Sequence, residues 1–230
     1  MTGTPELQAL YPFLHGKAQD GERLDAAVLA SIAEKARESR AASERFFEAS
    51  APVLLGAAKA LAACYRAGGQ LFAMGNGGSS CDAAHVTVEF LHPVTAGRPA
   101  LPATNLAADI AQMTAVGNDV GFAHVFLRAL TARARQGDAL VGFSTSGNSD
   151  NLLAAFARAR EIGLVTIGFC GGDGGKMRAS GLVDHCLVVP ATSIHRIQEC
   201  HVTAYHILWD ITHSLLADDR GAASTKGTTP

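Results

Sequence analysis

The sequence predicts an α/β fold of three layers, a doubly wound parallel sheet with helices on both of its faces. Short apolar segments alternate along the chain with longer segments of helical periodicity, and this order is typical of parallel sheets. Two of the apolar segments, 70–74 and 139–143, lead into turns rich in glycine or serine, as buried strands do before a helix. The chain has 230 residues, 48% of them apolar, which is enough for the core of one domain.

The elements are expected in the following order. Residues 1–20 mix proline, glycine and charge, which predicts a loosely held arm. Apolar periodicity from 21 to 48 and again after Pro52 predicts a hairpin of two antiparallel helices over 21–67, with apolar faces that suit an oligomer. The α/β core is expected over 68–217 and a disordered polar tail over 218–230. Within the core we expect strands at 70–74, near 102, and at 139–143, 164–169 and 186–189, helices from about 79, 109, 122, 149 and 194, and a glycine-rich turn after 169.

Composition narrows the class of protein. A formal net charge of −2 gives no overall field that attracts nucleic acid, although it is compatible with a local anion site. No unbroken apolar run approaches the roughly 20 residues of a membrane span, and no secretion signal opens the chain. The five cysteines show no paired spacing. We therefore expect a cytoplasmic protein with reduced thiols that binds neither nucleic acid nor a membrane.

Two segments have the composition of phosphate-binding loops. Residues 75–80 are rich in glycine and lie between a strand and a helix, so backbone N–H groups can face an anion, with Ser79 as N-cap. A tight turn with an ordinary cap explains this loop equally well. Residues 143–149 carry four hydroxyl groups in the same setting. Neither loop has the lysine of a nucleotide-binding P-loop, which favours a phosphate that is held rather than transferred. The candidate contacts are Asn76, Gly77, Gly78, Ser79, Ser144, Thr145, Ser146 and Ser149.

Side chains suited to acid/base or metal chemistry occur on two of the expected helices. His85 and Glu89 are four residues apart and share one face, although a solvated pair is the commoner meaning of this spacing. On the last helix Gln198 and His206 lie about 80° apart, two turns along, so both can face one cavity, whereas His201 points elsewhere. Two histidines, a carboxylate and an amide suit a divalent ion such as zinc. They suit an acid/base set without a metal equally well, and the spacing does not decide between the two.

Five segments together resemble the sugar isomerase (SIS) domain family, and within it the phosphoheptose isomerases, in order over about 25–217. They read GNGGSSCDAAH followed by VEF, AVGNDVGF, GFSTSGNSDN, GGDGGKM and RIQECHVTAYH. The resemblance implies a single SIS domain with aldose–ketose isomerase activity. The reaction would convert sedoheptulose 7-phosphate to D-glycero-D-manno-heptose 7-phosphate through an enediolate.

The resemblance also implies roles for individual residues. The serines and the threonine named above would bind the phosphate, Asp109 and Gln198 would contact the substrate, and Glu89 and His206 would form the catalytic acid/base pair. One zinc ion per subunit would be held by His85, Glu89, Gln198 and His206. The family's assembly is a homotetramer with active sites at subunit interfaces, and the phosphorylated sugar is its substrate.

The chain departs from the family pattern at three positions. Pro93 stands where the family has a substrate-binding arginine, His195 where it has an aspartate at the sugar, and Ala111 where a serine is usual. These changes favour, as an alternative, a paralogue that isomerises another sugar phosphate. A second alternative is a non-catalytic tetrameric module like the family's replication regulator, which lacks the glutamate equivalent to Glu89. The chain length disfavours a sensor with a DNA-binding domain and an aminosugar synthase with an amidotransferase domain.

Overall fold

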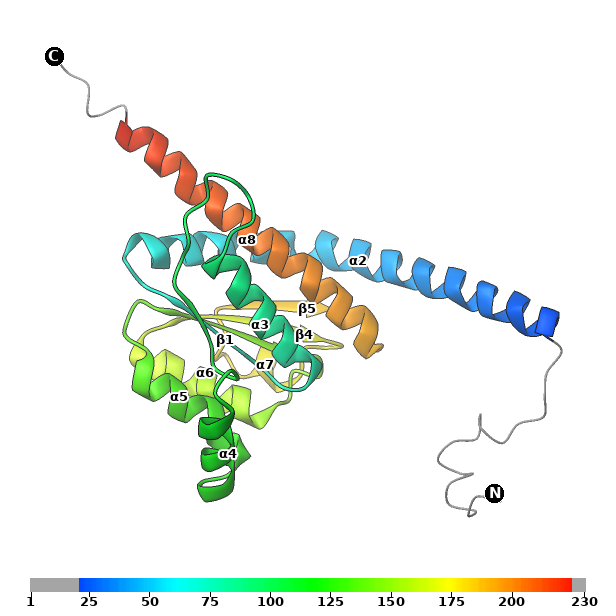
Figure 1. Cartoon of the computed structure of the whole chain (residues 1–230), viewed down its shortest axis with the longest axis horizontal. Coiled ribbons are helices and arrows are strands. Elements are labelled where there is room, and N and C mark those ends of the chain that lie inside the picture. The colour runs from blue at the N-terminus through cyan, green and yellow to red at the C-terminus, as the bar shows by residue number, and fades with distance from the viewer. Residues whose placement is uncertain (1–20, 225–230) are drawn as a thin grey trace. The chain divides into compact units, whose positions relative to one another are not determined.

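The computed structural model describes residues 21–224, with side chains for 24–217 (Figure 1). The expected N-terminal arm at 1–20 lies outside these residues, as does 225–230. The described elements are α2 (Gly21–Arg66), β1 (Leu71–Gly75), α3 (Gly78–Leu91), β2 (Ala103–Asn105), α4 (Ile110–Asp119), the 3₁₀ turn η2 (Phe122–His124), α5 (Val125–Arg133), β3 (Ala139–Ser144), α6 (Asp150–Ile162), β4 (Val165–Gly171), α7 (Gly175–Ala179), β5 (His185–Val189) and α8 (Ile194–Ser224).

The five strands form one parallel sheet in the order β2-β1-β3-β4-β5. Successive side chains of a strand point to opposite faces, and this alternation divides the core in two. Leu71 and Ala73 of β1 are buried with residues of α2, α3 and α8, whereas Phe72 and Met74 are buried with residues of α5 and α6. The predicted three-layer architecture is therefore confirmed.

The order of the strands places a switch point between β1 and β3. From β1 the chain passes through α3 to the edge strand β2, and it then returns to the other side of β1 to form β3. In open α/β sheets, ligands bind beyond the carboxyl ends of the strands at such a point. The two candidate phosphate loops directly follow β1 and β3, so the topology brings them to the same edge of the sheet.

The expected N-terminal hairpin is wrong, because α2 is one continuous helix with Pro52 inside it. Ala42, Phe46 and Leu54 are all buried in the same core cluster, and Leu61 extends it. This spacing continues across the proline, so the part of α2 from Ala42 onward keeps one face in the core. Burial of that face offsets the backbone hydrogen bond that proline lacks.

Two compact units divide between Arg40 and Ala41, so α2 contributes to both. The N-terminal unit, described from residue 21, is helical and exposes Leu24, Val28, Leu29 and Ile32. The larger unit contains the sheet, the remaining helices and both candidate loops.

The expectation that no segment could cross a membrane does not hold by length and composition alone. Leu24–Arg66 contains an 18-residue window with a mean hydropathy of 1.3, of which 39% is buried in the protein. Core helices of soluble proteins pass the same test. Ala57, Ala58 and Leu61 of this helix are fully buried in the sheet's core, which accounts for its apolar composition.

Two further elements differ from expectation. Residues 175–179, in the expected glycine-rich turn, form α7, whose five residues are too few to show a helical period. At the other end, α8 continues to Ser224, into the segment expected as a disordered tail, because alanines at 217, 222 and 223 favour helix.

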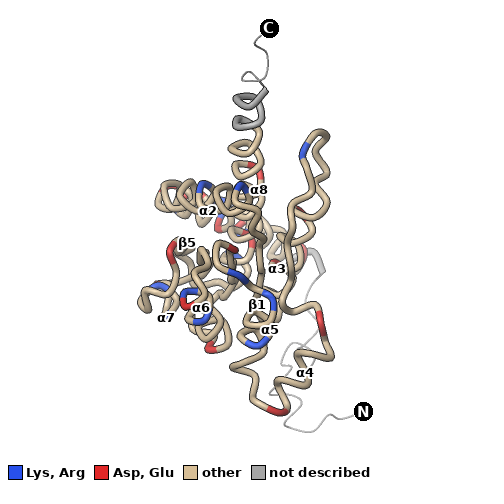
Figure 2. Tube along the Cα trace, turned by 90° about the vertical axis from the view of Figure 1, so that its left-hand side faces the viewer, with Lys and Arg blue, Asp and Glu red and all other residues tan. Residues whose placement is uncertain are grey.

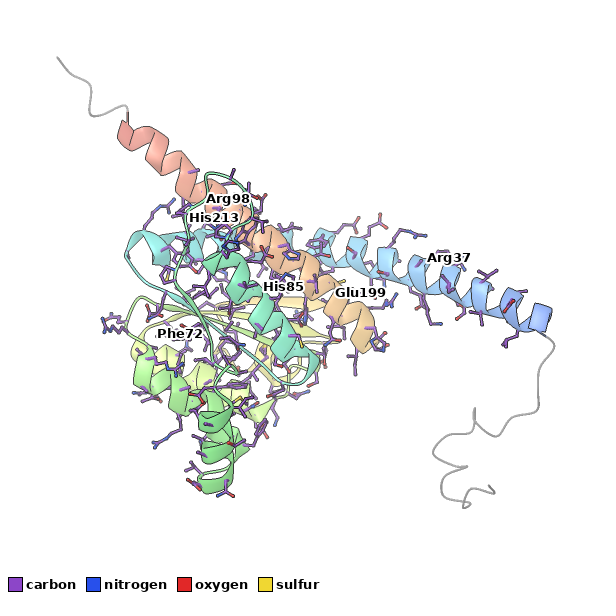
Figure 3. All side chains as sticks on the ribbon, viewed as in Figure 1. Arg37, Phe72, His85, Arg98, Glu199 and His213 are labelled. Atoms are coloured by element: carbon purple, nitrogen blue, oxygen red, sulfur yellow. The ribbon has the colours of Figure 1, made fainter. Side chains whose placement is uncertain are left out.

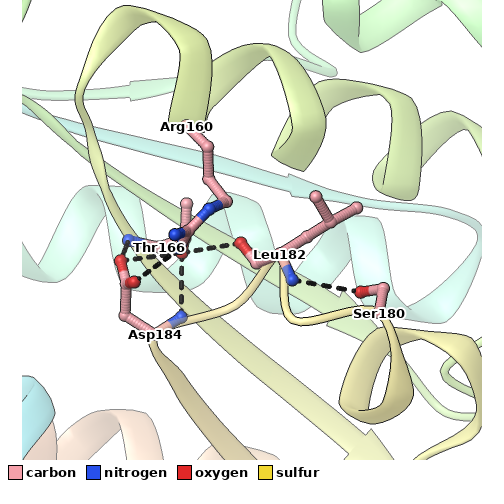
Figure 4. A network of polar contacts seen from close by, with 5 residues as sticks. All are labelled: Arg160, Thr166, Ser180, Leu182 and Asp184. Atoms are coloured by element: carbon pink, nitrogen blue, oxygen red, sulfur yellow. Dashed lines mark hydrogen bonds and ion pairs between the residues drawn. The ribbon is translucent and has the colours of Figure 1, made fainter.

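Polar contacts hold the start of β4 beside the start of β5 (Figure 4). The Asp184 carboxylate accepts hydrogen bonds from the backbone N–H of Thr166 at 3.0 Å, from its hydroxyl at 2.9 Å and from Arg160 at 2.7 Å. Burial raises the pKa of Asp184, but the hydrogen bonds from Thr166 and Arg160 outweigh it and hold the pKa below its ordinary value. This network lies at the amino-terminal ends of β4 and β5, whereas the candidate loops follow the carboxyl ends of β1 and β3. Its role is therefore structural.

Charged residues of both signs are interspersed along the described trace (Figure 2). This distribution agrees with the small net charge of −2.

Candidate active site

The first candidate loop is a sharp turn from β1 into α3. A Cβ atom on Gly75 would lie 2.2 Å from the Ser79 carbonyl oxygen, so only glycine fits where the two elements meet. The N-cap is Gly77, with φ of 53°, and Ser79 lies inside the first helical turn. The expectation that Ser79 caps the helix is therefore wrong, since the positive φ that the turn requires falls at Gly77 and places the cap two residues earlier. Ser79 is 5% exposed.

The second candidate loop carries its hydroxyl groups between β3 and α6. The side-chain oxygens of Ser144 and Ser149 lie 2.9 Å apart, and Ser146 accepts a hydrogen bond from the backbone N–H of Asn148. Gly147 has φ of 65°, and a Cβ there would lie 2.1 Å from the Gly174 carbonyl oxygen. The loop is therefore packed tightly against the turn that follows β4.

The two loops are joined by a pair of amide side chains. Asn76 donates to Asn151 and Asn151 donates to Asn76, each at 2.9 Å, and Asn151 is 3% exposed at the start of α6. Asn151 also accepts a hydrogen bond from the backbone N–H of Leu152. The side chain of Asn76 is thus occupied in holding the loops together, which leaves its backbone for contact with a ligand.

A His–Glu–His group is formed by residues of α3 and α8. Figure 3 labels its first member, His85 on α3. Glu89 Oε1 is 3.1 Å from His85 Nε2 and 3.8 Å from His206 Nε2. The ligand atoms of these three residues lie within 4.8 Å of one another, close enough to hold one metal ion. Glu89 is mostly buried, with 17% of its side chain exposed, while His85 and His206 are 44% and 41% exposed.

Larger residues of α8 support this group. The hydroxyl of Tyr205 lies 2.7 Å from His85 Nδ1, and the indole N–H of Trp209 donates to the Glu89 carbonyl at 2.8 Å. The guanidinium of Arg98 lies 4.3 Å from the centre of the Trp209 ring and pairs with Asp210. The end of α3 that carries Glu89 is therefore fixed against α8 through its backbone.

Burial perturbs two ionisable groups here. It lowers the pKa of His206, as does the neighbouring His85, whereas Glu89 opposes the shift. Burial raises the pKa of Asp82, one turn before His85 on α3, to about 6, with His85 opposing the rise. Asp82 Oδ2 has no hydrogen-bond partner among the described residues. Burial therefore disfavours the charged form of both side chains.

Helices α3 and α8 run parallel in a fixed register. Gln198 lies against Gly78, His85 against Tyr205 and Glu89 against Trp209, each pair 120 positions apart. Gln198 is therefore at the glycine loop. Gly78 lies seven residues before His85 on α3, which is ~10 Å at the rise of a helix. The structure brings three of the four predicted metal ligands together and places Gln198 at the other end of the same helix pair.

Glu89 and His206 line one open hollow of about 530 Å³ with Thr203, Trp209 and Asp210. Asp109 lines a different one, of about 650 Å³, with Thr87, Leu91 and Ile110. The Asp109 carboxylate also caps α4 by accepting a hydrogen bond from Gln112 N–H at 2.9 Å. Within one chain, Asp109 is thus not part of the His–Glu–His group.

Sequence reasoning did not identify Asn151, Tyr205, Trp209 or Asp82 as parts of the site. Asp82 lies three residues before His85 and so shares its face of α3, a spacing that could have pointed to it. Tyr205 and Trp209 are apolar in pattern and indistinguishable from core residues until the register of α8 on α3 is known. The same register places His201 away from the group, as expected. It is fully buried, with Nε2 3.3 Å from the Cys170 carbonyl oxygen.

Comparison with known proteins places the chain in a family. The SIS domain model matches residues 36–171. A phosphoheptose isomerase of Desulfovibrio desulfuricans is 44% identical over 192 residues, covering 83% of this chain and 90% of that protein. A phosphoheptose isomerase of Pelobacter propionicus is 41% identical over 189 residues, covering 82% of this chain and 99% of that protein.

Solved structures agree with these relatives. A phosphoheptose isomerase from Francisella tularensis superposes with a TM-score of 0.78 at 34% identity, covering 81% of this chain and 98% of that one. A phosphoheptose isomerase from Neisseria gonorrhoeae has a TM-score of 0.75 at 36% identity, covering 80% of this chain and 99% of that one. The chain therefore belongs to the SIS domain family and, within it, to the phosphoheptose isomerases.

Proposed function

We propose that this protein isomerises sedoheptulose 7-phosphate to D-glycero-D-manno-heptose 7-phosphate. The observation that carries the proposal is the His–Glu–His group at one end of the paired helices α3 and α8, with the glycine loop at the other end. An extended sugar phosphate has a phosphate at one end and its reacting carbons at the other. The arrangement supports one chain holding both ends of such a substrate.

The phosphate is proposed to bind where the two loops meet at the switch point. Its contacts would be the backbone of residues 76–78 and the hydroxyl groups of 79, 144, 145, 146 and 149. Such distant binding holds the substrate in one orientation, so that the reacting carbons meet the acid/base pair. Gln198, beside Gly78, is well placed for the sugar at this end.

Glu89 and His206 are proposed to carry the protons. One removes a proton from the hydroxyl-bearing carbon next to the carbonyl to give an enediolate. A proton then passes from the hydroxyl oxygen to the former carbonyl oxygen, and the other residue returns a proton to the former carbonyl carbon. Groups in these two roles each contribute on the order of 10²–10⁴-fold to the rate. The 3.8 Å between Glu89 Oε1 and His206 Nε2 supports both acting on adjacent atoms of one molecule.

Zinc is the metal that the donor set fits best, because two imidazole nitrogens and a carboxylate oxygen are its common ligands. His85, Glu89 and His206 would hold it, and Gln198 is the fourth ligand that the family resemblance implies. When bound, zinc would polarise the sugar's oxygens and stabilise the charge of the enediolate. The same three side chains also suit acid/base catalysis alone, so the test must compare both states.

A different sugar phosphate is the second candidate substrate, and the departures at three positions favour it. Pro93 and His195 replace residues with which the family contacts the sugar, and Ala111 replaces a usual serine, whereas the loops and the acid/base pair are retained. Asp109 remains a proposed contact of the sugar, although it lines a different hollow from Glu89 and His206. A partner subunit would have to bring Asp109 to the sugar.

We further propose a homotetramer in the cytoplasm. Leu91, Val94 and Ile110 are 47%, 80% and 76% exposed, and an assembled interface would cover such side chains. The five cysteines are free thiols, as in a reducing compartment.

NMR of sedoheptulose 7-phosphate incubated with the protein tests the proposal. The protein is stripped of metal, assayed, and assayed again with zinc added. We expect signals of an aldoheptose 7-phosphate, and zinc dependence shows whether the metal takes part. Absence of the product in both states, with a pentose or hexose phosphate converted instead, would favour the second candidate. Binding of phosphosugars without any turnover would refute an isomerase.

A further inference from the structure

Tyr205 is a buried residue of the site to which the proposed reaction gives no role. It lies on α8 directly before His206 and is 1% exposed. Its hydroxyl oxygen is 2.7 Å from Nδ1 of His85, a short contact between a side chain of α8 and one of α3. A buried phenol needs a hydrogen-bond partner, and here the partner is one of the three residues that group around Glu89.

The contact assigns different tasks to the two nitrogens of His85. Nδ1 faces Tyr205, and Nε2 faces Glu89 at 3.1 Å. For His85 to bind an ion through Nε2, the ring must be neutral, with its proton on Nδ1. The Tyr205 hydroxyl oxygen can accept a hydrogen bond from that proton, which fixes both the tautomer and the rotation of the ring.

The ring of Tyr205 also limits how both histidines can move. Its centre lies 5.4 Å from that of His85, with 75° between the planes, and 4.8 Å from that of His206, with 62° between the planes. It also packs edge-on against Phe143 of β3, with the ring centres 5.8 Å apart. Tyr205 is thus held by the sheet and in turn touches both imidazoles of the group.

We propose that Tyr205 is a positioning residue that holds His85 with Nε2 directed at the metal ion. This inference rests on the metal site of the proposed function. It predicts that the hydroxyl group, separately from the ring, raises the affinity of the site for zinc. A tyrosine that only fills the core would leave that affinity unchanged when its hydroxyl is removed.

The test compares Tyr205→Phe with Tyr65→Phe in the full chain. Both variants lose one hydroxyl and keep the ring. Tyr65 lies on α2, whereas the His–Glu–His group lies on α3 and α8. The Tyr65 hydroxyl donates to the Pro102 carbonyl at 3.4 Å. The dissociation constant for zinc is measured by competition with a coloured chelator, and the cobalt-loaded proteins are compared by their visible spectra.

We expect Tyr205→Phe to weaken zinc binding about 10–100-fold, the usual effect of removing a hydrogen-bond partner of a ligating histidine. The cobalt spectrum should change, and Tyr65→Phe should match the unaltered protein in both measurements. Equal zinc affinity and an equal cobalt spectrum in Tyr205→Phe would overturn the inference and leave the metal site in place. If the unaltered protein binds no zinc, the metal site itself fails, and this inference fails with it.

Discussion

Glu89 is the residue on which the proposed chemistry depends most. Its carboxylate lies beside both imidazoles, and its backbone carbonyl is held by Trp209. Replacing it with glutamine keeps its shape and removes both the base and the anionic ligand. We expect Glu89→Gln to lower kcat by at least about 10²-fold while the protein still binds phosphosugar. Turnover by NMR and binding by calorimetry measure the two effects.

Glu161→Gln is the matched control for this prediction. Glu161 is an exposed residue of α6 that pairs with Arg158, and its replacement should leave turnover unchanged. Equal loss of turnover and binding in Glu89→Gln would contradict the acid/base role.

His201 gives the stability of the protein a pH dependence. Burial lowers its pKa to about 4, and Nδ1 has no hydrogen-bond partner among the described residues. An unfolded histidine takes up a proton near pH 6.5, whereas the folded one does so only near pH 4. The stability contributed by the neutral ring is therefore complete above pH 6.5 and is lost as the pH falls through this window, by up to about 3 kcal/mol.

The variant His201→Gln tests this pH dependence. Glutamine can donate to the Cys170 carbonyl and does not titrate. We expect its melting temperature to fall less than that of the unaltered protein between pH 7 and pH 4.5. Asp82 changes stability in the opposite direction over part of this range, but it is present in both proteins. Parallel melting curves against pH would show that His201 is not the group responsible.

Among the elements, the two loops at the switch point depend on the Asn76–Asn151 pair. Replacing Asn151 with alanine removes its two hydrogen bonds with Asn76 and the one that it accepts from Leu152 N–H, and it leaves the amide of Asn76 unpaired beside α6. We expect Asn151→Ala to destabilise the protein by about 1–3 kcal/mol and to raise KM for the sugar phosphate more than it lowers kcat. Urea unfolding and steady-state kinetics measure these changes.

Asn118→Ala is a suitable comparison, because Asn118 makes one exposed hydrogen bond, to the adjacent Asp119. It should change stability by less than about 0.5 kcal/mol. If Asn151→Ala behaves in the same way, the pair does not hold the loops.

The elements also show where the sequence was sufficient for prediction. Strands that end in glycine or serine were predictable, because a buried apolar run and the turn after it are local features. Pro52 was misleading, since the burial that keeps α2 continuous comes from the sheet and not from the helix. Asn151 and Tyr205 could not be identified because their partners, Asn76 and His85, are brought to them only by the packing of distant segments.

At the scale of the whole molecule, the proposed tetramer predicts a mass in solution. Light scattering should give about 95 kDa, four times the 23.8 kDa of one chain. Ile110 is 76% exposed, so Ile110→Asp should reduce the mass without lowering the melting temperature of the subunit core. A mass near 24 kDa for the unaltered protein would contradict the assembly and leave Asp109 without a route to the sugar.

The parallel register of α3 and α8 has a consequence for how this family can vary in length. Three contacts, from Gly78 to Trp209, each join positions 120 apart. One residue inserted within either helix rotates every later side chain by ~100°, which would separate the histidines from Glu89. An insertion in a surface loop between the two helices changes the numbering but moves no contact. Natural gain and loss of residues should therefore be confined to those loops, and the two helices should keep a constant length.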